Sequence, residues 1–222
     1  MNFKKLENNL LDMIQEQQVK IGYMSGVTRF YYPLQSLNRL LGTELTEEEM
    51  QHAMEKFSDH ACDRLGKVTA SSKNGRFCIT LPPQASDYVH ENRKPSEFLV
   101  RFIGTVARHG CTLDEVMDVF HAYSDHVHME KTTGTGFDYL VYFEDGIPDD
   151  YRYCLSLEGE HMIYHKFTLL IAFRTPAGDS LDLIKKPPVC RQIFKKSSAD
   201  RRLFLFSMHG ISSASPAPYL SS

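Results

Sequence analysis

The fold is decided between Thr28 and Tyr88, where the chain reads TRFYYPLQSLNRLLGTELTEEEMQHAMEKFSDHACDRLGKVTASSKNGRFCITLPPQASDY. The β-branched and aromatic run at its start predicts a short strand, and the leucine-rich stretch after it predicts a helix. Thr46 and Glu49 have the spacing of a capping box, which predicts that a second helix begins there. Asn74-Gly75 supplies the two positive φ angles of a tight hairpin turn, so two paired strands should follow that helix. A short helical turn, Gln84 to His90, should come after the hairpin.

This order of strand, helix, helix and hairpin resembles that of winged-helix domains. The closing segment, RFCITLPPQASDYV at residues 76–89, also resembles the exit from the wing in bacterial winged-helix regulators. The resemblance implies DNA binding through the helix that begins at Thr46, because base-reading residues normally lie at the start of that helix.

The charges of the same region argue against DNA binding. Three carboxylates at the start of the second helix would face phosphate oxygens: Glu47, Glu48 and Glu49. A carboxylate also favours the positive end of a helix dipole, which is a purely structural reason for their presence. The alternative of a DNA-binding protein therefore depends on three cations on or beside the hairpin: Lys67, Lys73 and Arg76.

A polar segment with a proline, residues 91–96, divides the chain into a domain of residues 1–92 and a domain of residues 96–167. The first domain also contains an amphipathic helix, predicted for residues 3–20. In the second domain, capping residues predict one helix that begins at Ser96 and ends at Gly110, and a second that begins at Thr112. Alternating apolar and polar residues then predict three to four antiparallel strands. We therefore expect an α+β protein, with a winged-helix-like domain followed by a domain of two helices and an antiparallel sheet.

Histidine is frequent in the second domain, and two predicted strands carry a pair each: His126 and His128 on the first strand, and His161 and His165 on the last. Side chains alternate along a strand, so each pair shares one face of the sheet. If the first and last strands are neighbours, these imidazoles can converge with Glu130 on a divalent metal. The other interpretation, which we favour, is that they are surface histidines and that the protein holds no cofactor.

The composition excludes several functions. The formal net charge of the 222 residues is −3, so no general attraction to nucleic acid or anionic lipid is expected. No apolar run approaches the ~20 residues that span a bilayer, and the first residues lack the apolar run of a signal peptide. The five cysteines are scattered, which is typical of free thiols in the cytoplasm. Nucleotide-binding loops and nucleophile elbows are absent, so no catalytic residue is assigned.

The composition changes after His165. The chain from Lys166 to Ser222 has nine Lys or Arg against three Asp, and it ends in a stretch of Ser, Ala and Pro. One interpretation is a basic arm that binds nucleic acid or the acidic body of another copy. The other is a non-native extension. We expect residues 168–222 to be disordered or non-native, and we expect removal of residues 174–222 to leave the melting temperature unchanged.

A second resemblance covers residues 1–167. It is carried by three segments, Tyr32-Pro33-Leu34, His109-Gly110-Cys111-Thr112 and Phe143-Glu144-Asp145-Gly146, which resemble an uncharacterised bacterial family known only as a domain of unknown function. The resemblance implies no activity and no catalytic residue. We expect a cytoplasmic bacterial protein that binds or regulates through contacts with another protein and is not an enzyme. The alternatives are a DNA-binding regulator and a metal-dependent enzyme that uses the His126/His128 strand.

Overall fold

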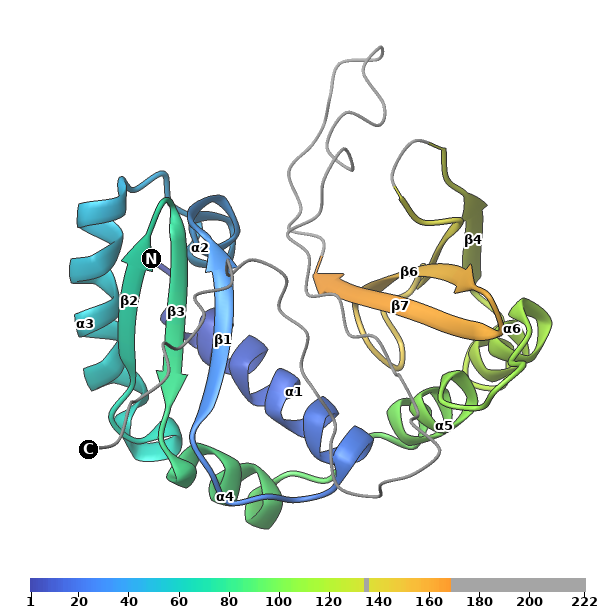
Figure 1. Ribbon diagram of the computed structural model, residues 1–222, viewed down its shortest axis with the longest axis horizontal. Helices are drawn as coiled ribbons and strands as arrows, with labels where there is room; N and C mark the ends of the chain where they lie inside the picture. The colour runs from blue at the N-terminus through green and yellow to red at the C-terminus, as the bar shows by residue number, and fades with distance from the viewer. Residues whose placement is uncertain (134–135, 169–222) are drawn as a thin grey trace, which may run out of the picture.

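The computed structural model describes residues 1–133 and 136–168 of the chain. Within these ranges the chain forms six helices and two antiparallel sheets, one of three strands and one of four, which confirms the α+β class (Figure 1). In chain order the elements are α1 (Phe3–Ile21), β1 (Thr28–Pro33), α2 (Leu34–Leu41), α3 (Glu47–Leu65), β2 (Thr69–Lys73), β3 (Arg76–Leu81), α4 (Pro83–Asn92), α5 (Glu97–Val106), α6 (Leu113–His121), β4 (Val127–Lys131), β5 (Tyr139–Phe143), β6 (Tyr151–Glu158) and β7 (His161–Thr168).

The first sheet has the strand order β1-β3-β2, so the β2–β3 hairpin returns to pair with β1. Its turn is Asn74-Gly75, with φ angles of 53° and 70°, as the sequence predicts. The tip of the hairpin is tied to two helices. The backbone N–H of Leu34 donates to the Gly75 carbonyl at 2.9 Å, and the N–H of Gly75 donates to the Glu47 carboxylate at 3.0 Å. The starts of α2 and α3 are thereby held against the turn.

Helices α1 and α4 complete the first core. The predicted amphipathic helix at the N-terminus forms α1 and buries Leu6, Leu10 and Ile14. The sequence predicted only a short helical turn after the hairpin, but α4 is a helix of 10 residues. It is longer because Pro83 occupies its first turn and because Ala85 and Val89, one turn apart, are both buried in the core.

The second core lies between the helix pair α5–α6 and one face of the four-stranded sheet. This sheet has the order β4-β5-β6-β7, a simple meander. Five aromatic rings fill the space: Phe98, Phe102, Phe120, Phe143 and Tyr153. Their edge-to-face contacts, such as Phe102 on Tyr153 with ring centroids 4.9 Å apart, are the favoured geometry for aromatic pairs.

The buried residues form two groups, one from Leu6 to Val89 and the other from Phe98 to Tyr164. The two parts nevertheless touch. Figure 1 shows α1 running from behind the three-stranded sheet towards α5, and Val19, near the end of α1, packs against the second core. The first helix of the chain therefore contributes to both cores.

Two further expectations concern the tail and the membrane. The tail predicted for residues 168–222 lies outside the described residues from residue 169 onward. In the part of the chain that the structure describes, no helix has the length and apolar character needed to cross a membrane.

Candidate functional site

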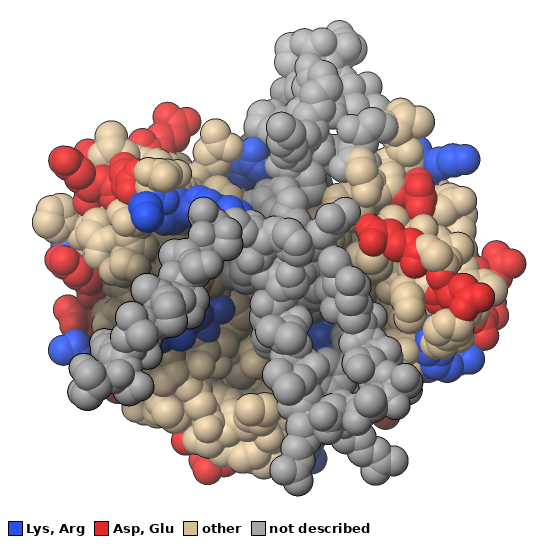
Figure 2. All heavy atoms as spheres, viewed as in Figure 1, with Lys and Arg blue, Asp and Glu red and all other residues tan. Residues whose placement is uncertain are grey.

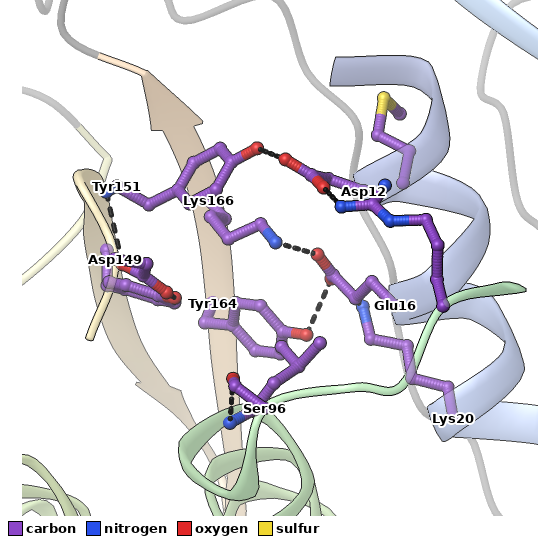
Figure 3. Close-up of polar contacts among 12 residues, drawn as sticks. Asp12, Glu16, Lys20, Ser96, Asp149, Tyr151, Tyr164 and Lys166 are labelled. Atoms are coloured by element: carbon purple, nitrogen blue, oxygen red, sulfur yellow. Dashed lines mark hydrogen bonds and ion pairs between the residues drawn. The ribbon is translucent and has the colours of Figure 1, made fainter. Parts of the chain in front are cut away.

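Two carboxylates on α1, Asp12 and Glu16, point away from the first core and towards strands β6 and β7 (Figure 3). They are four residues apart, so they lie on one side of the helix, one turn from each other. The apolar stripe of α1 occupies a different side and is buried in the first core. Helix α1 thus packs one face against the first core and places two carboxylates at the join between that core and the second sheet.

Glu16 is buried and has three partners. Its carboxylate lies 2.5 Å from the ammonium of Lys20 and 2.8 Å from that of Lys166, and it accepts a hydrogen bond from the hydroxyl of Tyr164 at 2.7 Å. Burial alone would raise the pKa of Glu16, but the charges of Lys166 and Lys20 outweigh it and hold the pKa well below its usual range. The carboxylate is therefore ionised at neutral pH.

Asp12 makes a second connection across the join. One of its oxygens accepts from the guanidinium of Arg93 at 2.7 Å, and the other accepts from the hydroxyl of Tyr151 at 2.5 Å. Arg93 lies in the link between α4 and α5, and Tyr151 begins β6. One carboxylate on α1 is thereby connected both to the linker and to the second sheet.

The tyrosines around these carboxylates are held in their protonated form. Burial, together with the negative charge of Asp12, raises the pKa of Tyr151 far above its usual range. Burial also raises the pKa of Tyr153, whose hydroxyl donates to Asp149 at 2.6 Å, and that of Tyr164 beside Glu16. Each hydroxyl acts as a hydrogen-bond donor, and none is poised to lose its proton near neutral pH.

Each of the two lysines in the cluster makes an ion pair with Glu16 and also contacts an aromatic ring. The ammonium of Lys166 lies 4.2 Å from the ring centroid of Tyr151, and that of Lys20 lies 4.5 Å from the ring centroid of Tyr164. Such cation–π contacts stabilise a desolvated ammonium beyond its ion pair. Because Glu16 is paired with both lysines and Asp12 with Arg93, the cluster resembles a structural tie between the two parts more than a set of reactive groups.

A shallow groove of about 340 Å³ opens beside this cluster. It is lined by the first half of α1, the end of α2 and the start of β6, through Asn2, Lys4, Lys5, Asn8, Asn9, Asp12, Leu40, Asp150 and Tyr151. The volume is at the lower end of the range for small-ligand sites, and charges of both signs line it.

The four histidines predicted as a metal site do not come together. Strands β4 and β7 lie at opposite edges of the second sheet, with β5 and β6 between them, so the condition for convergence is not met. His126 precedes β4, and His128 stacks on Tyr142 at 4.7 Å. At the other edge, the ring of His161 contacts that of His109, and the ring of His165 contacts that of Phe137. Among residues 1–133 and 136–168, no group of three or more His, Cys, Asp or Glu side chains is arranged to hold a metal ion.

The predicted DNA contacts are exposed. Lys67 precedes β2, and Lys73 and Arg76 face each other across the hairpin. The adjacent helix α3 presents mostly carboxylates to solvent: Glu48, Glu49, Glu55, Asp59 and Asp63 are exposed, against Lys56 and Arg64. Figure 2 shows Asp and Glu side chains along the edge of the molecule that α3 occupies in Figure 1. Glu47 is engaged by the hairpin turn, and Glu49 completes the capping box with Thr46.

The cysteines that the structure describes are free thiols. Burial raises the pKa of Cys154 to about 11 and also raises that of Cys111, so neither thiol is activated as a nucleophile.

Sequence reasoning missed the cluster on α1 completely. Its only signal in the sequence is two carboxylates one turn apart within a helix that is otherwise amphipathic, and surface helices often carry such pairs. The partners are Arg93, Tyr151, Tyr164 and Lys166, which lie 81 to 150 residues along the chain from the carboxylates they contact. No local pattern connects them.

The family comparison agrees with the extent of the described fold. The model of a family described as "Domain of unknown function, E. rectale Gene description (DUF3877)" matches residues 3–170. This is the kind of family that the sequence resembles, and the match ends close to where the composition of the chain changes. No curated protein and no solved structure matches the chain.

Proposed function

Because the chain belongs to the DUF3877 family of domains of unknown function, we propose its function from its own surfaces: a non-enzymatic binding or regulatory protein that acts through contacts with another protein. The observation that carries the proposal is the outward face of α3, where five exposed carboxylates stand against two cations. A basic segment of a partner protein is complementary to such a face.

The position of this face favours a protein partner over DNA. The element order of the first part resembles a winged helix, in which the equivalent of α3 would read the major groove. A helix with this charge would repel phosphates, which supply most of the affinity in protein–DNA complexes. The hairpin tip is also bonded to Glu47 at the start of the helix, so the carboxylate stands beside Lys73 and Arg76 and reduces their attraction for DNA.

The buried charges support a non-enzymatic role. Asp12 and Glu16 are engaged by Arg93, Lys20, Lys166 and two tyrosines, and the shifted tyrosine pKa values lie away from the range useful for acid–base catalysis. Free thiols and the bacterial species in the family description are consistent with action in a bacterial cytoplasm, which is part of the proposal.

A charge-reversal experiment tests the proposal. The triple variant Glu48→Lys, Glu55→Lys and Asp59→Lys inverts the face of α3, and fluorescence anisotropy measures binding of a labelled lysine- and arginine-rich peptide to the full chain. The matched control, Glu91→Lys, Asp118→Lys and Asp125→Lys, makes the same change in net charge at exposed positions elsewhere. We expect the α3 variant to lose peptide binding and the control to keep most of it.

The DNA alternative is tested in the same assay. A labelled DNA duplex replaces the peptide, and the salt concentration is varied. Tight duplex binding with a steep salt dependence, lost in the variant Lys73→Glu and Arg76→Glu, would overturn the proposal in favour of a DNA-binding regulator. Equal loss of peptide binding in both triple variants would also overturn it, because the attraction would then belong to net charge and not to α3.

A further inference from the structure

Strand β4 forms one edge of the four-stranded sheet, on the side that faces away from the first sheet (Figure 1). The hydrogen bonds at its two ends show which residues bond to β5. The N–H of Glu144 donates to the His126 carbonyl at 2.9 Å, and the N–H of Thr132 donates to the Asp138 carbonyl at 2.8 Å. In an antiparallel ladder such pairs recur at every second residue. Residues 128 and 130 therefore direct their backbone groups towards β5.

The intervening residues direct theirs outward. The N–H and C=O groups of Val127, Met129 and Lys131 point out of the sheet, and the part of the chain that the structure describes supplies no backbone partner for them. Natural edge strands are protected by short length, charged side chains, a proline, a bulge or a covering element, and β4 is a strand of 5 residues that carries Glu130 and Lys131. Strand β4 contains no proline, pairs with β5 in an unbroken register and leaves the Met129 side chain 45% exposed.

We propose that β4 pairs with β4 of a second copy of this chain, antiparallel about a twofold axis at Met129, so that two four-stranded sheets join into one. With the axis there, the outward groups of Met129 face those of the second copy's Met129. Those of Val127 face the second copy's Lys131, and the reverse holds by symmetry. Every outward N–H of the strand then meets a carbonyl, which is the geometry of an isologous dimer.

The side chains favour this register. Across the axis, residue 128 of one copy lies opposite residue 130 of the other, and the two exchange no backbone hydrogen bonds. In such pairs the side chains approach each other most closely. His128 of one copy therefore lies opposite Glu130 of the other, twice in the dimer. Within one chain the ring of His128 already lies 3.4 Å from the carboxylate of Glu144 and 3.7 Å from that of Glu130. An axis moved by two residues to Lys131 would instead place two ammonium groups opposite each other, which is unfavourable.

The test is the oligomeric state of the full chain, measured by sedimentation velocity across the micromolar range. Met129→Lys places two like charges face to face on the axis, and we expect it to raise the dimer dissociation constant by more than about tenfold. Leu157→Lys is the matched control, since Leu157 is an exposed apolar residue on β6 with 54% of its surface accessible. It should leave the dimer intact.

Two further readouts separate this interface from other causes. Glu130→Lys should weaken the dimer, and the swap His128→Glu with Glu130→Lys should restore it, because the opposite charges are then exchanged across the axis. Hydrogen exchange should protect the amides of residues 128 and 130 at all concentrations and those of 127, 129 and 131 only in the dimer. A wild-type chain that stays monomeric, a Met129→Lys variant that still dimerises, or outward amides that exchange fast in the dimer would each overturn the proposal.

Discussion

The hydroxyl of Tyr164 on β7 donates a hydrogen bond of 2.7 Å to the carboxylate of Glu16 on α1, although the two residues lie 148 positions apart in the chain. Lys166, two residues along the same strand, adds an ion pair to the same carboxylate. Because side chains alternate along a strand, Tyr164 and Lys166 share the face that meets α1. The last described strand and the first helix are thus joined at one buried charge, and this arrangement has measurable consequences.

Replacing Glu16 with Gln should destabilise the protein strongly. The amide keeps the shape of the side chain but leaves Lys20 and Lys166 without their anion, and breaking a buried ion pair in this way costs about 3–5 kcal/mol. Urea unfolding measures the change in the free energy of unfolding. Glu55→Gln, on the exposed face of α3, is the control and should cost under about 0.5 kcal/mol. A loss at Glu16 no larger than that of the control would contradict the assigned role of the cluster.

Stability should fall in acid partly through Glu16. Its pKa in the folded protein lies below the ordinary value of 4.5, so its contribution is present above about pH 4.5 and is lost as the pH falls towards the folded-state pKa. Asp149 acts in the opposite direction, because burial raises its pKa and its ionised form opposes folding. The free energy of unfolding between about pH 5 and pH 3 should therefore fall less steeply in Glu16→Gln than in the wild type. Parallel curves would argue that Glu16 does not titrate as the structure implies.

Three tyrosines should resist ionisation until the protein unfolds. The pKa values of Tyr151, Tyr153 and Tyr164 are all raised in the folded protein. The free energy of unfolding should therefore fall as the pH rises above about 10, the pKa of tyrosine in the unfolded chain. Ultraviolet absorbance of tyrosinate, followed against pH beside circular dichroism, counts the residues that ionise before unfolding. Each Tyr→Phe variant should leave the early phase of the titration unchanged. Loss of early amplitude in any of the three would show that its hydroxyl is accessible in the folded protein.

The contact between Tyr151 and Asp12 should show energetic coupling. Tyr151→Phe removes a hydrogen bond to a charged group, which costs about 1.5–3 kcal/mol. In an Asp12→Asn background the same substitution should cost clearly less, because the charged acceptor is already gone. A double-mutant cycle from urea unfolding measures the difference, and contacting residues typically couple by about 0.5–3 kcal/mol. Additive effects would indicate that the hydroxyl of Tyr151 and the carboxylate do not interact in solution.

Most of the local structure could be predicted from the sequence. Thr46 and Glu49 form the capping box at the start of α3, Thr112 and Glu115 form another at α6, and Asn74-Gly75 makes the hairpin turn. Each signal depends on bonds within a few residues, so sequence alone suffices. The errors lie at element ends, where packing decides: α5 ends at Val106 and not at Gly110, and β4 begins at Val127, which leaves His126 outside the strand.

The candidate sites divide in the same way. The acidic start of α3 can be read directly from three consecutive glutamates in the sequence. No knowledge of contacts between distant residues is needed to find it. The expected convergence of the four histidines depended on a strand order, and alternation along a strand fixes faces but not neighbours. Once β4 and β7 occupy opposite edges, no histidine pair can meet the other across the sheet.

The sequence by itself determined the capped helices, the hairpin, the α+β class and the acidic start of α3, because periodicity, capping and turn chemistry act over a few residues. The tertiary structure alone decided that Asp12 and Glu16 meet Arg93, Tyr151, Tyr164 and Lys166, and that β4 is left as an open edge. These features depend on which elements become neighbours. That choice is made by burial of the two cores, which brings together residues that the sequence separates by most of its described length.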